Sequence, residues 1–415
     1  MALMCKDLPM LRWMTAGESH GPALTAMIDG LPAGLELTSE RIERDLAQRR
    51  QGYGRGARQA FERDVLTITG GLRHGKTLGS PLSFHIANSE WPKWTAVMSP
   101  DPVDPALLRK DAGTGDEREI ARNKKLTRPR PGHADLAGMM KYDVDDARNI
   151  LERASARETA SRVVVGTVAS EILRQVAGIE LVSHVVSIGD VELPVDTPLP
   201  SADMNEALNA HPVRCCDEVT GQAMMDLIDR TKQEGNTLGG VVEVIAYNVP
   251  VGLGSHTQWD RRLDSQLAAA VMSIQSVKGV EIGDAWRQAH VPGTQAHDPI
   301  TSIYSGTIER SSNYAGGVEG GMSNGAPLRV RAALKPISTV PRALESVDLD
   351  TGQSTVGLHQ RSDVCAVVPA AFIAQSMVAL TLAQALLEKT GGDSIVECRR
   401  NLEAYLEHVD ERTTW

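Results

Sequence analysis

The order in which strand-like and helix-like segments follow one another restricts the fold of this chain most strongly. Alternating or continuous apolar runs predict strands at residues 11–15, 65–69, 181–188, 241–247 and 328–334. Apolar positions at helical spacing predict helices at residues 39–50, 156–176, 221–234, 261–273, 370–389 and 393–407. Because the two kinds of segment do not alternate as in βαβ units, we expect an α+β fold with antiparallel sheets.

No segment of the chain has the composition of a linker between domains. The length of 415 residues allows two or three domains, but there is no Pro/Ser/Gly-rich tract, no low-complexity region and no repeat of solenoid length. We therefore expect one loop-rich compact unit over residues 1–415. The charged residues 101–128 predict a long exposed loop, and loops of this length are commonly functional or mobile.

The composition excludes several classes of protein. A net charge of -10 argues against a general nucleic-acid binder, and an aromatic content of 4% argues against stacking platforms for single-stranded nucleic acid. The five cysteines include no C-x-x-C pair and no zinc-type spacing, so we expect reduced thiols and no metal site.

The same sequence indicates a cytoplasmic location. The N-terminus has no continuous apolar core of a signal peptide. The most apolar stretch, residues 369–387, contains Gln375, Ser376, Thr381 and Gln384, which suits a buried helix better than a membrane span.

Arginine greatly outnumbers lysine, with 32 Arg against 11 Lys among the 43 basic residues. Codon usage is one explanation, but position adds another, because seven of these arginines fall within residues 41–63, around the glycines of RRQGYGRGARQ. Glycines allow a close approach of the backbone to a ligand, and the planar guanidinium binds carboxylate and phosphate through two parallel hydrogen bonds. The cluster predicts a site for a compact polyanion, while a solvated helix face remains the alternative for its first members.

Two histidines lie in loops that suit proton transfer. His20 lies in AGESHGP and His133 in RPRPGHAD, where Arg128 and Arg130 suggest an anion nearby. A lone loop histidine is more often a structural hydrogen-bonding group, so the neighbouring cations favour the catalytic interpretation. Farther along, Arg361 and Asp363 stand two residues apart, and Asp363 is a candidate base or orienting carboxylate.

Two local patterns have plain structural interpretations. Ser155 and Glu158 have the S-x-x-E spacing of a capping box, which also places Arg153 and Arg157 at a helix N-terminus that favours anions. Residues 70–77 match a P-loop formally, but the following segment alternates like a strand, so we expect a β-hairpin instead.

Taken in order, the motifs resemble the chorismate synthase family over nearly the whole chain. They are GESHGP at 17–22, RRQGYGRGAR at 49–58, RPGHAD at 130–135, RASARETA at 153–160, GGVVEV from 239, SIQSVKGVEIG from 273, GGMSNG from 320, LKP from 334 and RSDVCAV from 361. The resemblance implies conversion of 5-enolpyruvylshikimate 3-phosphate to chorismate and phosphate. This 1,4-anti elimination belongs to the shikimate pathway of aromatic amino-acid biosynthesis and requires reduced FMN without net redox change. It also implies helices sandwiched between two antiparallel sheets, and a homotetramer.

The resemblance further implies roles for individual residues. His20 and His133 correspond to the proton-transferring histidines, and Asp363 to the carboxylate that helps remove the C6 proton. The implied substrate-binding residues are Ser19, His20, Arg49, Arg58, Arg130, Arg157 and Arg361. The implied flavin-binding residues are Arg49, Arg55, Arg153, Ala154, Ser155, Gln275, Ser276, Gly320, Lys335, Pro336, Ile337, Ser338, Thr339 and Arg361. Gln275 and Ser276 stand where many relatives have Asn and Ala.

Some alternatives remain open from the sequence. Some relatives reduce their flavin with NADPH, whereas others depend on an external flavin reductase. A non-catalytic flavin- or polyanion-binding protein on the same scaffold is a second hypothesis, and a Gly/Arg RNA-binding module is a third. The enzyme hypothesis expects a small-molecule substrate, with neither nucleic acid nor a membrane as partner.

Overall fold

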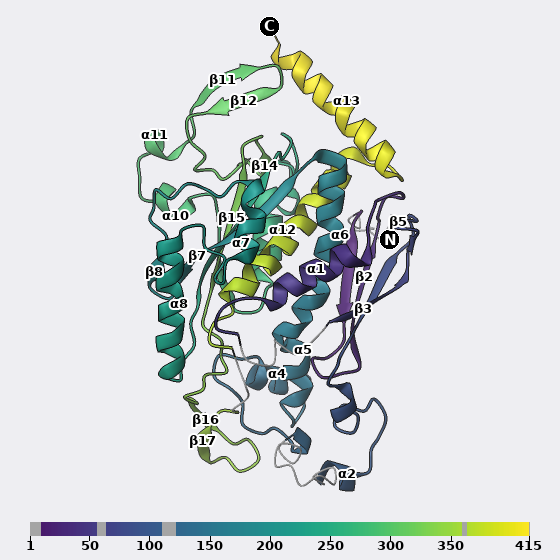
Figure 1. Cartoon of the computed structure of the whole chain (residues 1–415), viewed down its shortest axis with the longest axis vertical. Helices are drawn as coiled ribbons and strands as arrows, with labels where there is room; N and C mark the ends of the chain where they lie inside the picture. The colour runs from purple at the N-terminus through teal and green to yellow at the C-terminus, as the bar shows by residue number, and fades with distance from the viewer. Residues whose placement is uncertain (1–9, 56–63, 110–121, 359–362, 415) are drawn as a thin grey trace, which may run out of the picture.

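A computed structural model of the chain describes residues 10–55, 64–109, 122–358 and 363–414 (Figure 1). Two residues that the sequence assigns to the substrate, Arg58 and Arg361, lie outside the described residues, and so does Cys5.

The described strands form two larger antiparallel sheets and several short hairpins. The first sheet has the order β1-β2-β6-β3, and the second has the order β10-β15-β9-β7-β8. Their strands are β1 (Arg12–Ala16), β2 (Ala23–Asp29), β3 (Val65–Gly70), β6 (Leu82–Ala87), β7 (Glu180–Ile188), β8 (Val191–Glu192), β9 (Gly240–Tyr247), β10 (Val277–Ile282) and β15 (Leu328–Leu334). The hairpin strands are β4 (Leu72–Arg73), β5 (Lys76–Thr77), β11 (Ile300–Tyr304), β12 (Thr307–Arg310), β13 (Val318–Glu319), β14 (Met322–Ser323), β16 (Glu345–Val347) and β17 (Ser354–Val356).

Three long or central helices, α1, α6 and α12, run through the middle of the molecule. The α-helices are α1 (Ser39–Arg50), α2 (Pro105–Arg109), α4 (Asp135–Tyr142), α5 (Arg148–Ala154), α6 (Thr159–Ala177), α7 (Asn205–Ala210), α8 (Glu218–Gln233), α9 (Leu263–Met272), α10 (Ala285–Gln288), α11 (Gly293–Ala296), α12 (Val367–Thr390) and α13 (Ile395–Thr413). Single 3₁₀ turns are η2 (Trp91–Lys93), η3 (Ala156–Glu158), η4 (Ala202–Met204) and η5 (Trp259–Arg261).

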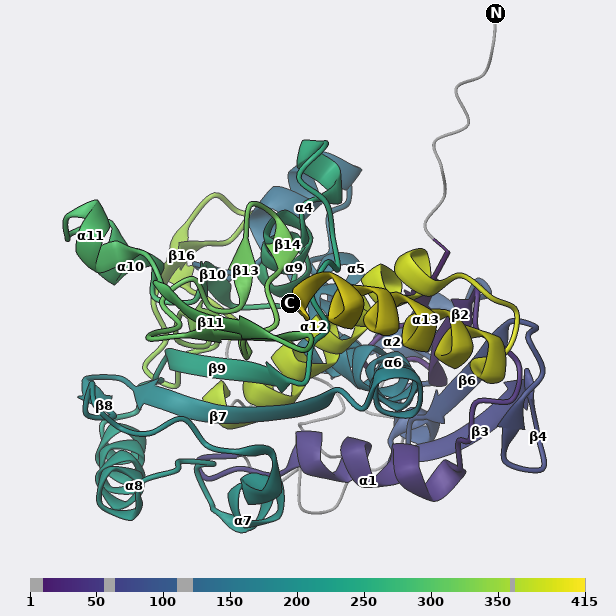
Figure 2. The same cartoon turned by 90° about the horizontal axis from the view of Figure 1, so that it is seen from above.

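Helices α6 and α12 lie between the two sheets, as Figure 2 shows from above. Helix α6 packs against β2 and β6 of the first sheet, α12 packs against β7 and β9 of the second, and the two helices pack on each other. One hydrophobic cluster of buried residues extends through all of these elements. The expected α+β fold, with helices between two antiparallel sheets, is confirmed.

Helix α12 is apolar around its whole circumference because it lies in the centre of the sandwich. Its mean hydropathy reaches 1.7, enough by length and composition to cross a membrane, but 83% of that apolar window is buried inside the protein. A helix buried on all sides needs no polar face. The expectation of a buried helix at residues 369–387 is therefore confirmed.

Local signals set the ends of the central helices. Thr38 caps α1 by accepting a hydrogen bond from the backbone N of Arg41 at 3.2 Å. Gly178 ends α6 in the left-handed conformation at φ 64°. Gly391 follows the last turn of α12.

Several segments differ in detail from the sequence expectations, and helix α13 extends to Thr413 where the sequence predicts an end at residue 407. The helix expected from residue 156 begins instead at Thr159, after the separate 3₁₀ turn η3. Within residues 101–128, Pro105–Arg109 form the short helix α2 and Leu126 is buried, while residues 110–121 lie outside the described part. The exposed loop as a whole stays a prediction. The segment that resembled a P-loop forms strands β3 to β6, so the β-hairpin interpretation is confirmed.

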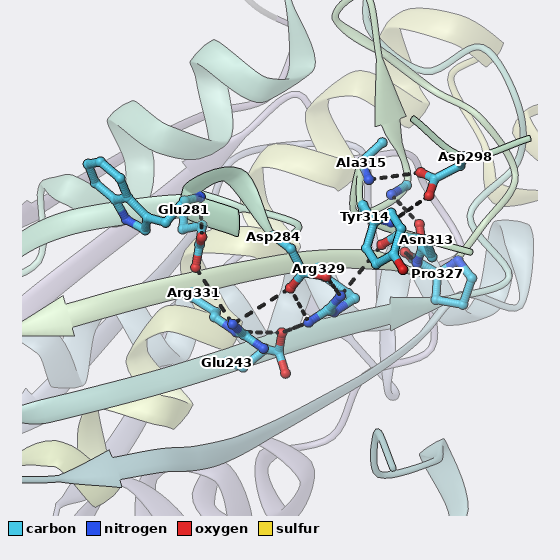
Figure 3. Close-up of polar contacts among 12 residues, drawn as sticks. Glu243, Glu281, Asp284, Asp298, Asn313, Tyr314, Ala315, Pro327, Arg329 and Arg331 are labelled. Atoms are coloured by element: carbon cyan, nitrogen blue, oxygen red, sulfur yellow. Dashed lines mark hydrogen bonds and ion pairs between the residues drawn. The ribbon is translucent and has the colours of Figure 1, made fainter. Parts of the chain in front are cut away.

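A polar network ties three strands of the second sheet together (Figure 3). Glu243 on β9 accepts hydrogen bonds from Arg329 Nη2 at 2.9 Å and Arg331 Nε at 3.0 Å, both on β15. Arg329 also reaches Asp284, and Arg331 pairs with Glu281 of β10. Because every member has an opposite charge nearby, the network holds charge inside the sheet without leaving it unpaired.

Candidate active site

His20 is held by two elements that are distant in sequence. It lies in the loop between β1 and β2, and its backbone N donates to Oε2 of Glu152 on α5 at 2.9 Å. The ring Nδ1 lies 2.9 Å from Oε1 and 3.0 Å from Oε2 of the same carboxylate. The ring also stacks on the indole of Trp94, with 3.8 Å between centroids and 22° between planes.

The turn before His20 depends on glycine. Gly17 has φ 102°, and a Cβ there would lie 2.5 Å from the carbonyl O of Ala23. Ser19 follows, 6% exposed, with its backbone N donating to the carbonyl of Glu152 at 3.0 Å. Asn88 supports the turn from β6 by donating to the carbonyls of Ser19 and Gly21.

The helix is interrupted between α5 and η3, and this interruption brings Ser155 next to Ser19. Ser155 has extended backbone, at φ -63° and ψ 140°, which separates Ala154 at the end of α5 from η3. Its Oγ accepts from Arg157 N at 3.3 Å and donates to Ser19 Oγ at 3.2 Å. Ser155 thus caps the turn as expected.

Glu158, in contrast, is not the second half of a capping box. Its carboxylate is buried and accepts from Thr15 Oγ1 at 2.8 Å, Arg162 Nε at 2.9 Å and Gln275 Nε2 at 3.1 Å. Burial raises its pKa, but the charge of Arg162 and these hydrogen bonds outweigh burial, so the pKa is lowered. Glu158 links β1 with the segment after α9.

Arg153 also contacts strand β1 and the loop that follows it. Its Nη2 donates to Thr15 Oγ1 at 2.7 Å, and its Nη1 donates to the carbonyl of Gly17 at 3.2 Å. Arg153, Ser155 and Gln275, all expected at the flavin, therefore lie around one junction of β1, α5 and η3.

Arg49 and Arg157 approach this junction from opposite sides. Arg49, at the end of α1 and 6% exposed, donates through Nε to Thr159 Oγ1 at 3.1 Å. Its Nη2 lies 3.4 Å from the carbonyls of Ala156 and of Arg157. Arg157 Nη1 lies 3.5 Å from Asp64 Oδ1, and that carboxylate also pairs with Arg50.

Arg55 and Asp363 form an ion pair next to α1. The two atoms Nη1 and Oδ2 lie 2.8 Å apart, and both side chains are largely buried. The backbone N of Val364 donates to the carbonyl of Gly54 at 2.9 Å, which joins the two loops. The cation expected at the flavin and the carboxylate expected to act as a base are thus direct neighbours.

His133 belongs to a separate cluster around Asp135, a carboxylate that is 0% exposed. Asp135 Oδ2 accepts from Arg130 Nε at 2.8 Å, and Oδ1 lies 2.5 Å from His133 Nδ1. Since a carboxylate only accepts, Nδ1 carries the proton here. Arg130 also donates to Thr339 Oγ1 at 2.9 Å.

The segment Lys335 to Thr339 connects this cluster to Ser276. Lys335 Nζ donates to the carbonyl of Gly132 at 2.5 Å, and Lys335 N donates to the carbonyl of Ser276 at 2.9 Å. Ile337 O accepts from Thr237 Oγ1, whereas Pro336 and Ser338 are partly or fully exposed. Gly320 lies in the turn between β13 and β14, where the next residue packs against the start of α9.

Comparisons with known proteins identify the family of the chain. The sequence profile of the chorismate synthase family matches residues 11–387. Chorismate synthase of Beutenbergia cavernae is 59% identical over 403 residues, covering 97% of this chain and 100% of that protein. That of Mycobacterium marinum is 59% identical over 405 residues and covers 97% of both chains. A crystal structure of chorismate synthase matches 97% of this chain and 98% of its own, with 38% identity and a TM-score of 0.75.

The chain belongs to the chorismate synthase family. Chorismate synthases are carbon–oxygen lyases of aromatic biosynthesis that act on a small-molecule substrate and depend on reduced flavin. The resemblance stated from the motifs is therefore confirmed at the level of family, fold and enzyme class.

The residues expected at the flavin of a chorismate synthase fit a polar ligand with hydrogen-bond donors. Gln275 is the clearest case, because its Nε2 is used by Glu158 while its Oε1 is buried without a hydrogen-bond partner among the described residues. A buried acceptor of this kind is costly unless a ligand or water satisfies it. Neighbouring Ser276 holds φ 70°, a conformation unusual for a residue with a side chain.

Several residues that shape this site were missed by the sequence analysis. They are Trp94, Arg148, Glu152, Asp64 and Asp135. Asp135 is the last residue of the motif RPGHAD, and Glu152 directly precedes RASARETA. Their positions at the ends of these motifs are the sequence signal that could have identified them. Trp94 and Asp64 carry no local signal, because their partners lie far away in the sequence.

Proposed function

We propose that this chain converts 5-enolpyruvylshikimate 3-phosphate to chorismate and phosphate by a 1,4-anti elimination that requires reduced FMN without net redox change. Membership of the chorismate synthase family over residues 11–387 carries this conclusion. The arrangement around Ser19, His20 and Ser155 supports it, because these residues meet beside the arginines of α1 and η3. The substrate carries two carboxylates and a phosphate, which guanidinium groups bind well.

The substrate-binding residues in this proposal are Ser19, His20, Arg49, Arg58, Arg130, Arg157 and Arg361. Arg49 is buried and its guanidinium is fixed by Thr159, so little side-chain freedom remains to be lost on binding. Arg130 is oriented by Asp135, which directs its remaining N–H groups.

Two residues carry the proposed proton transfers to and from the substrate. His20 gives a proton to the departing phosphate as the C–O bond breaks. Asp363 takes part in removal of the C6 proton, and its ion pair with Arg55 keeps the carboxylate in one orientation. Together these steps remove one proton and one phosphate, as the elimination requires.

The reduced flavin in this proposal contacts Arg49, Arg55, Arg153, Ala154, Ser155, Gln275, Ser276, Gly320, Arg361 and the segment from Lys335 to Thr339. When bound, it supplies electron density that assists C–O cleavage and is returned at the end. His133, held by Asp135, lies beside this segment through the contact of Lys335 with Gly132. With the flavin bound, His133 would be the residue of this segment's cluster that holds a proton near it.

An anaerobic assay tests the function directly. Purified protein, chemically reduced FMN and 5-enolpyruvylshikimate 3-phosphate are mixed without oxygen, and chorismate and phosphate are measured. We expect turnover by the wild type, and losses of roughly 10²-fold or more in His20→Ala and in His133→Ala. A folded wild type that binds FMN without releasing phosphate contradicts the proposal and identifies a non-catalytic flavin-binding protein.

Three further features belong to the same proposal. We infer a cytoplasmic homotetramer with no requirement for nucleic acid or membrane. The source of reducing equivalents is either NADPH used by the protein itself or an external flavin reductase. Turnover driven by NADPH and FMN, with no added reductase, decides between these two sources, and sedimentation equilibrium measures the assembly.

A further inference from the structure

Glu152 makes more contacts to His20 than a single hydrogen bond requires. Its Oε2 accepts from the backbone N of His20 at 2.9 Å, and both carboxylate oxygens lie within 3.0 Å of the ring Nδ1. The backbone N–H only donates, so Oε2 must be an acceptor there. Because one carboxylate binds both the backbone N–H and the ring of His20, it fixes the position of the whole residue.

The carboxylate itself is held in place. Glu152 is 2% exposed and lies on α5, where Arg148 one turn earlier brings Nη1 to 3.8 Å from Oε1. Arg148 is buried as well, and its Nη2 donates to the carbonyl of Arg122 at 2.7 Å. The backbone carbonyl of Glu152 accepts from Ser19, so α5 and the His20 loop are joined twice.

Trp94 closes one face of the His20 ring. Its indole stacks on the imidazole at 3.8 Å, and the guanidinium carbons of Arg122 and Arg148 lie 5.3 Å and 5.5 Å from the indole ring. A stacked ring cannot rotate about its Cβ–Cγ bond without losing this contact. Helix α5 and Trp94 therefore restrict the ring from two directions.

We propose that Glu152 is a positioning residue for His20, which commits Nδ1 to the carboxylate and leaves Nε2 as the nitrogen that transfers the proton. This inference rests on the proposed role of His20 as the acid toward the departing phosphate. With Nδ1 bonded to Glu152, the proton that the ring gives up is the one at Nε2. After the transfer, the neutral ring keeps its Nδ1 proton and the bond to Glu152.

Among the residues that the structure describes, the charged groups around the ring include Glu152 and Arg148 from α5 and Arg122 from the segment before α4. Ser19, Ser155 and Asn88 add neutral contacts to the loop. Glu152 is an anion in direct contact with the imidazole, so removal of its charge tests the effect of this contact on the ring.

Glu152→Gln keeps the shape of the side chain and removes its charge. We expect kcat to fall roughly 10- to 100-fold, as for other residues that orient a reacting group, with little change in KM. The pH–kcat profile of Glu152→Gln is expected to differ from that of the wild type, because the imidazole loses the carboxylate that holds Nδ1. Glu152→Asp retains the carboxylate on a shorter side chain, so its profile stays near that of the wild type.

Glu171→Gln is the matched control. Glu171 is also buried on a helix and pairs with Arg41 and Arg174, but it lies in α6 away from His20. We expect it to lower the melting temperature without moving the pH profile. A Glu152→Gln protein whose pH profile moves no more than that of the control overturns the inference.

A double-variant cycle separates positioning from general support. In the His20→Ala background, Glu152→Gln is expected to change kcat less than about twofold, since its effect passes through His20. A further 10-fold loss in that background contradicts the proposal. If the wild type itself releases no phosphate, the proposed function is wrong. Failure of the proposed function can therefore be distinguished from failure of the proposed role of Glu152.

A spectroscopic measurement supports or overturns the inference without any flavin. In protein labelled with ¹⁵N-histidine, the signal lost in His20→Ala identifies the imidazole of His20. We expect that signal to report a protonated Nδ1 in the wild type, and to change in Glu152→Gln but not in Glu171→Gln. An unchanged His20 signal in Glu152→Gln overturns the assignment of the Nδ1 proton to this carboxylate.

Discussion

Asp363 and Arg55, which are far apart in the sequence, form an ion pair with 2.8 Å between Oδ2 and Nη1. Arg55 lies in the loop after α1, and Asp363 lies in the loop before α12. A hydrogen bond from Val364 N to Gly54 O joins these two loops. The contact keeps a carboxylate at a defined place while its charge is balanced. A base held in this way is oriented before the substrate arrives.

Asp363→Asn is predicted to lower kcat by roughly 10²-fold or more while KM changes little, because the amide cannot take a proton. Phosphate release under anaerobic conditions measures the effect. Asp284→Asn is a suitable control, since Asp284 also pairs with an arginine but belongs to the network of the second sheet. A variant at Asp363 with near-normal turnover rejects its role as a base.

Gly54→Ala is predicted to disturb the same pair through the backbone. Gly54 has φ 82°, and a Cβ there would lie 2.9 Å from Cγ2 of Ile228. The strained backbone and the close contact cost roughly 1–3 kcal/mol. We expect a lower melting temperature and reduced turnover, whereas Gly34→Ala, where a Cβ meets nothing within 4 Å, shares only the backbone strain. Equal turnover in the two variants contradicts this explanation.

The long elements were predictable from the sequence because their apolar spacing is sustained. The strand expected at residues 328–334 is β15 without any shift, and the helix expected at 39–50 is α1. Errors occur where a partner distant in sequence decides the structure. The S-x-x-E pattern at Ser155 predicts a capping box, but Glu158 turns to Thr15 and Gln275, which no local pattern reveals.

In the candidate site, too, some residues have a local sequence signal and others depend on partners distant in sequence. Motifs located His20 and His133, which lie in loops with Gly and Pro, and Asp363, which stands two residues after Arg361. The side chains that hold them were found only in the structure, because Glu152 is separated from His20 by 132 positions. The single-domain expectation stays a prediction, supported by one hydrophobic cluster that extends through both sheets.

Asp135→Asn is predicted to lower kcat roughly 10- to 100-fold through His133 and Arg130. Burial raises the pKa of Asp135, but hydrogen bonds from His133 and Arg130 and the charge of Arg130 lower it well below its ordinary value. The side chain therefore acts as an anion that orients both partners. Asp298→Asn, a buried carboxylate that accepts from the backbone N of Tyr314 and Ala315, is the control for lost stability alone. Equal kinetic effects in the two variants contradict the prediction.

Two buried thiols are predicted to be inert in the native protein. Burial raises the pKa of Cys365 to about 12 and that of Cys215 to about 11. The thiolate is the reactive form, so at pH 8 labelling by a disulfide reagent is slow at both residues until the protein unfolds. Mass spectrometry of labelled native and urea-unfolded protein checks this. Rapid native labelling of Cys365 shows that the packing against Gly54 opens in solution.

Glu243→Gln is predicted to destabilise the second sheet and to leave kcat near the wild-type value. Burial raises the pKa of Glu243, but the hydrogen bond from His184 and the charges of Arg329 and Arg331 lower it from 4.5 to about 2. A carboxyl whose pKa is depressed in the folded state adds stability at pH above 4.5, and that stability is lost as the pH falls toward 2.

Removal of one member of a buried ion pair lowers the free energy of unfolding by about 3 kcal/mol or more. We expect a loss of about 3 kcal/mol for Glu243→Gln, because Asp284 still pairs with Arg329. Urea unfolding at pH 7, 5 and 3.5 measures the difference from the wild type, which we expect to be largest at pH 7 and to shrink below pH 4.5. Glu281→Gln is the matched control, since its carboxylate lies 3.7 Å from Arg331 and is less deeply buried. A difference that is independent of pH means that lost packing, and not the charge of Glu243, stabilises the sheet.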